Sequence, residues 1–219
     1  VLFRSPNSLN AGSLWGRPFY ILREAWNILN AIAEGKIESG DEKKLNALKG
    51  ETMAVIALCQ FDLTRCFGYP YTKDNGASLG APLIDHLVGT YENPSRSTVA
   101  EAYDVIIETL EEAVTLMSEE KNNGRMNKYA ARALLARVYL YHNDNRKAFD
   151  MADQLIKDVD ASGSYALYPH EKYVAAWSVE TKFGSESFFE IANSVDDTPG
   201  RDSWGYLLNW YGYQKGFVT

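Results

Sequence analysis

The chain has no excess of basic residues. Its 22 Lys and Arg are outnumbered by 29 Asp and Glu, which gives a formal net charge of −7. A general nucleic-acid surface needs clustered Lys and Arg, so this balance argues against nucleic acid as a partner. The sequence also lacks any apolar run close to the roughly 18 residues that mark a membrane-spanning helix.

Cysteine and histidine are scarce and poorly placed for chemistry. Cys59 and Cys66 fall seven residues apart in one predicted helix. That is about 10 Å along the helix axis, which is too far for a disulfide. We expect both to be small buried hydrophobic residues. His86, His142 and His170 are scattered among loops and turns, without metal spacing or a nucleophile partner.

Motifs that carry catalysis are missing as well. The sequence contains no nucleophile elbow, phosphate-binding loop or dinucleotide fingerprint. Asp196, Asp197 and Asp202 around Gly200 offer hard oxygen ligands, but their spacing matches no calcium loop. We therefore expect no metal site and no cofactor, and these residues offer no catalytic motif.

The clearest pattern present is a pair of helices over residues 129–159. Apolar residues recur at helical spacing on both sides of a short polar turn, residues 142–145. Small residues let the two backbones approach closely: Ala133, Ala136, Ala148 and Ala152. Such a pair cannot bury its whole apolar surface alone and stacks on others. The sequence therefore predicts an all-α, tetratricopeptide-like helical-repeat scaffold with long loops.

Two further helices are predicted at the start of the chain. The first spans about residues 17–34 and stops at Gly35. The second opens with a Ser-x-x-Glu capping box at residues 39–42 and reaches residue 67. It contains Gly50 at a cost of about 1 kcal/mol relative to Ala. We expect that glycine to allow close packing against another backbone.

The next helices follow a long connection. Residues 69–97 hold several Pro and Gly and are predicted to be irregular, and loops of this length are usually functional or disordered. A third helix begins at the capping box of residues 98–101 and breaks at residues 122–124. Asn127 is the predicted N-cap of the fourth helix, and the fifth ends near Asp160.

The remainder has a different character. Residues 165–168 are predicted to be extended, and residues 186–192 to form a strand or a buried connector. From residue 193 onward the sequence is rich in Asp, Gly, Trp and Tyr, and we expect mostly loop. Trp15 and Trp26 are expected in the core.

Four of these stretches, in this order, resemble the SusD/RagB family of nutrient-binding outer-membrane lipoproteins. Residues 61–68, FDLTRCFG, follow Gly50-Glu51 and resemble the family's GEA…YFDLVRLFG helix. Residues 97–113 resemble its S-x-E-E-x-Y…DLEEA helix, and residues 124–141 resemble its GR…ALLARVYLY helix. Residues 186–191, ESFFEI, resemble its E-S-I-F-E-I connector.

The resemblance implies a scaffold that sits on a SusC-like TonB-dependent outer-membrane transporter, captures oligosaccharides or peptides at the cell surface, and performs no catalysis. It covers about residues 12–192, which we expect to form the SusD-like helical-repeat domain after a non-native or disordered start at residues 1–11. We expect residues 193–219 to begin a C-terminal part that the chain lacks. The chain also lacks the family's lipidated N-terminal Cys, the expected anchor of the full-length protein in the outer membrane.

A glycan site needs aromatic platforms and polar groups on loops, because sugar rings have flat apolar faces edged with hydroxyls. Two segments supply both. After residue 68, beside Lys73, the predicted ligand-binding residues are Tyr69, Tyr71, Asp74 and Asn75. In the terminal segment, which also holds Tyr213, they are Arg201, Asp202, Trp204, Trp210 and Tyr211. The alternative is that these side chains pack under loops or against the missing half.

The predicted function is therefore cell-surface binding of oligosaccharides for nutrient uptake. A general tetratricopeptide adaptor that binds peptides is the alternative, but it predicts nearly uniform repeats of about 34 residues with short turns. An α-helical glycoside hydrolase would need two carboxylates facing each other roughly 5–10 Å apart. The sequence leaves open whether the ligand is starch, a host glycan, a plant polysaccharide or a peptide.

Overall fold

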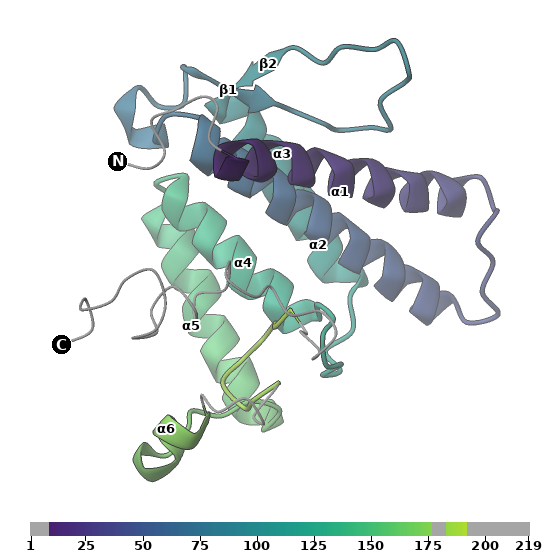
Figure 1. The fold of residues 1–219 in the computed structure, drawn as a ribbon. Coiled ribbons are helices and arrows are strands. Elements are labelled where there is room, and N and C mark those ends of the chain that lie inside the picture. Colours follow the sequence, from purple (N-terminus) through teal and green to yellow (C-terminus); the bar gives the residue numbers. More distant parts are fainter. Residues whose placement is uncertain (1–8, 177–182, 192–219) are drawn as a thin grey trace. The chain divides into compact units, whose positions relative to one another are not determined.

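The computed structural model describes residues 9–176 and 183–191 (Figure 1). The backbone forms two compact units, Val1–Phe189 and Glu190–Thr219. Only Glu190 and Ile191 of the second unit are described, so the account that follows concerns the first unit.

The described part of the first unit is mostly helical. Its helices are α1 (Leu9–Ala33), α2 (Glu42–Phe67), α3 (Val99–Leu116), α4 (Lys128–Tyr141), α5 (Asn145–Ser162) and the short α6 (Tyr173–Ala176). Between α2 and α3 lie the 3-10 turn η1 (Tyr71–Lys73) and the antiparallel strands β1 (Leu79–Pro82) and β2 (Arg96–Thr98); the 3-10 turn η2 (His170–Lys172) precedes α6. From α1 to α5, each helix packs against the next one along the chain. The predicted all-α helical-repeat architecture is confirmed, since neighbour-to-neighbour packing is its hallmark.

Helix α1 begins at Leu9, eight residues earlier than predicted, and continues through Pro18. Proline removes one hydrogen bond of the helix. Tertiary packing compensates, because the Trp15 ring lies 4.8 Å from that of Phe67 on α2, measured between ring centroids. The predicted stop is confirmed. Gly35 has φ +67° and donates its N–H to the Ile32 carbonyl, which ends the helix in a left-handed turn.

The predicted capping box of α2 is wrong. The N-cap is Asp41, whose carboxylate accepts hydrogen bonds from the N–H groups of Lys43 and Lys44 at 3.0 and 3.3 Å. Ser39 lies two residues before this N-cap, where its hydroxyl oxygen accepts from the Asp41 N–H. A charged acceptor at the positive end of the helix dipole is the stronger cap.

Helices α2 and α3 approach closely at Gly50, as predicted. A Cβ atom at this position would lie 2.7 Å from Cγ of Met117 and 2.9 Å from the carbonyl oxygen of Ala113. Helix α3 itself starts at the predicted capping box, with Thr98 and Glu101 bonded reciprocally. It ends at Leu116, earlier than the predicted break at residues 122–124.

Two hydrophobic cores share helix α2. The main core lies among α2, α3, α4 and α5, and Met53, Ala57 and Phe61 of α2 belong to it. The second core lies between α1, α2 and the start of the α2–α3 connection, and it includes Cys59 of α2. Cys59 is buried as predicted, but Cys66 is exposed, contrary to expectation, because it lies in the last turn of the helix.

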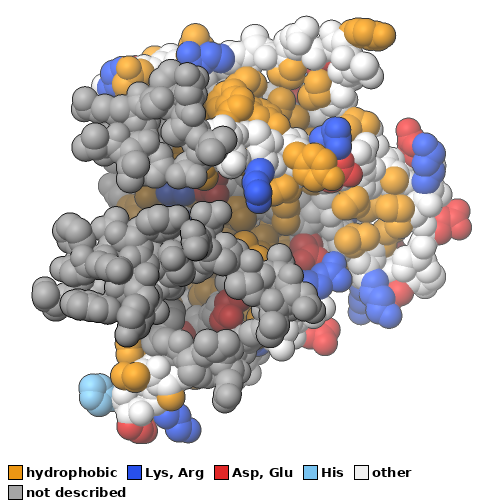
Figure 2. Space-filling model, viewed as in Figure 1, with side chains coloured by type: hydrophobic (Ala, Val, Ile, Leu, Met, Phe, Trp, Pro, Cys, Tyr) orange, Lys and Arg blue, Asp and Glu red, His pale blue; other side chains and the backbone are white. Residues whose placement is uncertain are grey.

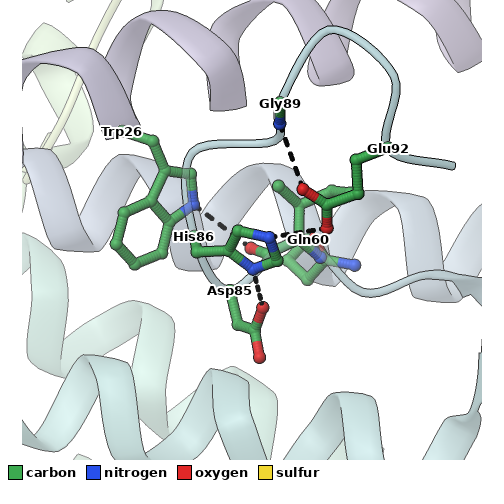
Figure 3. A network of polar contacts seen from close by, with 7 residues as sticks. Trp26, Gln60, Asp85, His86, Gly89 and Glu92 are labelled. Carbon is green, nitrogen blue, oxygen red and sulfur yellow. Dashed lines mark hydrogen bonds and ion pairs between the residues drawn. The ribbon is translucent and has the colours of Figure 1, made fainter. Parts of the chain in front are cut away.

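The α2–α3 connection is more ordered than predicted, because a buried glutamine anchors it. Gln60 donates to the carbonyl of Pro82 at 3.0 Å and accepts from the N–H of Ile84 at 3.3 Å. Trp26 of α1 donates its indole N–H to the Ile84 carbonyl at 3.2 Å. Figure 3 shows Trp26 and Gln60 beside His86, which lies between Asp85 and Glu92. The backbone groups of residues 82 and 84 thus find hydrogen-bond partners on both α1 and α2.

Apolar side chains remain exposed on α1. Figure 2 shows hydrophobic side chains gathered on the face that this helix crosses. The exposed ones from α1 are Leu14, Trp15, Tyr20, Ile21 and Ile28. Trp15 is 39% exposed, so the expectation that it lies in the core is wrong, whereas Trp26 is partly buried against the second core. Of the helices described, none has the length and apolarity to cross a membrane.

The C-terminal end of the unit forms no strand within the described residues. Residues 165–168 do not pair with another strand, although Tyr165 is buried. Phe188 and Phe189 are partly buried against the main core. Within the predicted segment 186–192, residues 186–189 are therefore a partly buried connector and not a strand, while Ile191 is 77% exposed. The predicted domain boundary at residue 192 stays a prediction.

Substituting Gly50→Ala should destabilise the protein, because the new methyl group overlaps the backbone of α3. Overpacking of this kind costs about 1–3 kcal/mol. Gly16→Ala in α1 is the matched control, since nothing lies within 4 Å of its Cβ position. It should stabilise by about 0.5–1 kcal/mol through helix propensity. Urea unfolding of both variants gives the comparison, and equal effects would contradict the close approach.

Substituting Gln60→Leu should remove both anchoring hydrogen bonds and leave the Pro82 carbonyl and the Ile84 N–H buried without partners. We expect a loss of about 2–4 kcal/mol in the free energy of unfolding. Gln154→Leu on the exposed side of α5 is the control and should change it by less than about 0.5 kcal/mol. A loss no larger than that of the control would mean that Gln60 does not hold the connection.

Candidate functional site

A hollow of about 340 Å³ is lined by the C-terminal ends of α2 and α4, the N-terminal half of α3 and the loop after α2. Its lining is dominated by aromatic side chains and carries one charged residue. The lining residues are Arg65, Tyr69, Pro70, Tyr71, Thr72, Tyr103, Leu140 and Tyr141. Each of the three helices and the loop after α2 therefore contributes to one surface.

The loop that carries Tyr69 and Tyr71 is set by the end of α2. Gly68 ends the helix and donates its N–H to the Thr64 carbonyl at 2.9 Å. A Cβ at Gly68 would lie 2.6 Å from that carbonyl oxygen, so glycine is required there. Pro70 then starts the turn η1, with a hydrogen bond from the Lys73 N–H to its carbonyl. Tyr69 and Tyr71 are the residues directly before and after this proline.

The same loop is tied down onto the first turn of α3. The N–H of Ala100 donates to the carbonyl of Gly76 at 2.9 Å. Asn75 and Gly76 both have left-handed backbone conformations, with φ of 54° and 76°. A Cβ at Gly76 would lie 2.8 Å from the ring of Tyr71. The turn therefore supports Tyr71 from behind, and this part of the hollow is preformed.

Aromatic rings form a continuous layer beneath the hollow. Tyr71 packs edge-to-face on Tyr103, with ring centroids 5.8 Å apart, and lies 4.4 Å from the ring of His142. Phe61 links Tyr103 at 6.1 Å to Tyr141 at 5.4 Å, again edge-to-face. Such pairs contribute about 0.5–1.5 kcal/mol each beyond their buried area. Above this layer, Tyr69 and Tyr141 are 56% and 44% exposed.

Two arginines surround the phenol of Tyr141. Arg65 lies over the rings of Phe61 and Tyr141, at 4.8 and 5.3 Å from Cζ to the centroids. Arg137, one turn before Tyr141 on α4, lies 5.9 Å from both rings. Hydrogen bonding from Arg65, and then from Arg137, holds the pKa of Tyr141 below its usual value. Burial has the opposite effect on Tyr103 and raises its pKa to about 12.

Two buried nitrogen atoms near the hollow lack a hydrogen-bond partner, Nε of Arg65 and Nδ1 of His142. They are the buried side-chain polar atoms left unpaired in the part of the chain that the structure describes. Most buried polar groups in proteins are hydrogen-bonded, so two unpaired nitrogen atoms at one end of the unit are unusual.

The structure places some of the predicted ligand-binding residues at the hollow and others elsewhere. Tyr69 and Tyr71 line it. Lys73 packs its ammonium group 3.1 Å from the centroid of the Tyr69 ring. Asp74 is engaged by the hydroxyl of Ser78, and Asn75 forms the turn, so neither lines the hollow. The terminal candidates lie outside the described residues: Arg201, Asp202, Trp204, Trp210 and Tyr211.

Sequence reasoning missed the contributions of the helices. Arg65 and Tyr103 each lie in a segment that resembles the family, and Tyr103 is buried on α3, but the sequence assigns neither to a site. Tyr141 follows the buried Tyr139 by two positions and so points to another side of α4. A large aromatic side chain in the last turn before the polar turn 142–145 was the available signal.

A second hollow of about 570 Å³ lies between α1 and the segment after β1, and its lining includes Trp15, Phe19, Arg23 and His86. Its polar groups already pair with one another: Arg23 with Glu24 at 2.8 Å, and His86 with two carboxylates. Among the described residues, no three His, Cys, Asp or Glu gather in a way that could hold a metal. The hollow beside Arg65 is therefore the better candidate for a polar ligand.

Substituting Arg137→Gln should raise the pKa of Tyr141 toward its ordinary value, because one of the two hydrogen-bonding cations is lost. In the native protein the lowered pKa favours the phenolate. That contribution to stability is present above the unfolded phenol's pKa and is lost as the pH falls through the folded one. An NMR titration of ring-labelled tyrosine, assigned with Tyr141→Phe, measures the shift. An unchanged midpoint would show that Arg137 does not reach the phenol.

Comparison with known proteins places this geometry in context. A SusD-like family model, described as starch-binding and associating with the outer membrane, matches residues 6–140. A SusD superfamily protein from Bacteroides vulgatus ATCC 8482 is 95% identical, with a TM-score of 0.91 over 95% of this chain and 47% of that one. No curated protein matches the chain.

Two more distant solved structures agree. A putative sugar-binding protein from Bacteroides vulgatus ATCC 8482 is 40% identical, with a TM-score of 0.84 over 92% of this chain and 45% of its own length. A SusD superfamily protein from Bacteroides thetaiotaomicron VPI-5482 is 39% identical, with a TM-score of 0.78 over 84% of this chain and 39% of its own. The chain thus spans less than half the length of these relatives. On the family match and the close relative together, the chain belongs to the SusD-like family.

Proposed function

We propose that the protein binds oligosaccharides and that the hollow between Tyr69 and Tyr141 is a contact site for them. The observation that carries this proposal is the convergence of exposed tyrosines from two different elements over a preformed aromatic layer. Flat apolar rings of this kind fit the faces of sugar rings, and the phenol, guanidinium and hydroxyl groups around them can hydrogen-bond to sugar hydroxyls.

The family supports the same function. Its description is starch-binding, and one relative that is 40% identical is described as a putative sugar-binding protein. Hydrolysis is less well supported by the hollow, since no carboxylate lines it within the described part of the chain. A glycoside hydrolase uses two such groups on either side of the scissile bond. We therefore propose binding without catalysis.

The wider assembly belongs to the proposal as well. We infer that residues 12–192 act as the receptor scaffold, and that the full-length protein is lipid-anchored at the outer-membrane surface beside a SusC-like TonB-dependent transporter. Arg201, Asp202, Trp204, Trp210 and Tyr211 remain proposed as a second group of ligand contacts, with Asp74 and Asn75 at the border of the first. Co-purification of the transporter with the tagged protein from membranes tests the partnership.

Replacing either tyrosine should weaken glycan binding without unfolding the protein. For Tyr69→Ala and Tyr141→Ala we expect about tenfold weaker binding, equivalent to about 1.4 kcal/mol, through loss of a stacking surface. Tyr91→Ala is the matched control, because Tyr91 is 97% exposed and does not line the hollow. Calorimetry of the intact protein against a panel of soluble oligosaccharides provides the measurement.

The panel also separates the alternatives. Saturable binding that survives both tyrosine variants but is lost in Trp204→Ala would move the site to the terminal segment. If no oligosaccharide binds while peptides do, the glycan proposal is wrong and the adaptor alternative holds.

A further inference from the structure

The polar groups at the hollow are unusual for a chain with a net charge of −7. Among the described residues, its one charged lining residue is a cation, Arg65, and none is a carboxylate or carboxamide. The remaining polar groups are phenols and the hydroxyl of Thr72. These hydroxyls both donate and accept, as sugar hydroxyls do, whereas the guanidinium only donates and carries a positive charge.

The guanidinium of Arg65 is held in place and only partly neutralised. Its side chain is 24% exposed and is fixed between the rings of Phe61 and Tyr141. One terminal nitrogen pairs with Asp62 at 2.5 Å, while Nε is buried without a partner. Stacking on rings leaves the edge of a guanidinium free to form hydrogen bonds in its own plane.

A second guanidinium lies on the other side of the same phenol. Arg137 is exposed on α4, lies at 5.9 Å from the ring of Tyr141, and makes no ion pair with any described carboxylate. Lys73, stacked on Tyr69, adds a third cation at the rim. Two carboxylates belong to the same part of the chain: Asp62 is paired with Arg65, and Asp74 is bonded to Ser78. The lowered pKa of Tyr141 is in keeping with a locally positive potential.

We propose that this hollow selects oligosaccharides that carry an anionic group, a carboxylate or a sulfate ester, held between Arg65 and Arg137 while the sugar ring stacks on Tyr141. The inference rests on the proposed glycan-binding function and names its ligand class. Guanidinium groups match carboxylate and sulfate oxygens with paired hydrogen bonds, and such charge-assisted contacts are roughly twice as strong as neutral ones.

The experiment compares three groups of soluble oligosaccharides on the intact protein by calorimetry, at low and at high salt. The groups are neutral glucans, oligogalacturonates and sulfated glycosaminoglycan oligosaccharides, so that carboxylate and sulfate are told apart. The variants are Arg137→Gln, which changes an exposed side chain, and Arg65→Lys, which keeps the charge but removes the fork. Arg146→Gln is the matched control, since Arg146 is an exposed arginine on α5 that does not line the hollow and pairs with Asp150.

We expect at least one class of anionic oligosaccharide to bind at least about tenfold more tightly than the neutral glucans. This preference should shrink at high salt because exposed charges are screened. Arg137→Gln should weaken anionic binding about tenfold and neutral binding far less, Arg65→Lys should weaken anionic binding severalfold, and Arg146→Gln should have no effect. Neutral glucans that bind as tightly as the anionic ones, with no effect of Arg137→Gln, would overturn the charge selection while leaving glycan binding intact. Failure of all three groups to bind would overturn the glycan proposal itself.

Discussion

The fold depends on one helix being enclosed on two sides. Helix α2 contributes to both hydrophobic cores, so its polar groups cannot rely on solvent. Thr52 and Thr64 return their hydroxyls to carbonyls one turn earlier, at 2.8 Å in each case. Gln60 has no such local solution and instead bonds to the backbone of residues 82 and 84. The need to satisfy one buried amide therefore decides where the α2–α3 connection runs, because an unpaired buried amide costs on the order of 1–3 kcal/mol.

The candidate site follows from the same constraint. The first half of the α2–α3 connection is held at two places, at Gly76 by the first turn of α3 and at residues 82 and 84 by Gln60, so the loop after Gly68 has little freedom. Its two tyrosines are presented by a rigid support. A ligand that binds such a surface does not have to order a loop, and this reduces the entropic cost of association. The candidate surface is thus built mainly from helix ends, and the packed interiors of the helices hold those ends in position.

Local signals in the sequence predicted much of this arrangement. The left-handed stop at Gly35, the capping box at Thr98 and the close approach at Gly50 each depend on a few neighbouring residues, and all three are confirmed. Ser39 was a wrong N-cap because two acceptors competed within three residues, and the charged one won. The hairpin and the course of residues 79–98 depend on a glutamine about twenty residues away, which no periodicity reveals. The sequence did not predict Tyr141 at the site for a similar reason, because its neighbours at the hollow come from α2 and from the loop after it.

The unequal burial of the two cysteines gives α2 a natural chemical reporter. Burial, with a smaller contribution from Asp62, raises the pKa of the Cys59 thiol to about 11, so the reactive thiolate is scarce near neutral pH. Cys66, seven residues later on the same helix, is exposed to solvent. An alkylating reagent should therefore modify Cys66 in the native protein and reach Cys59 only when the packing around α2 opens. The ratio of the two alkylation rates would report how often the shared helix becomes accessible, without any label added to the chain.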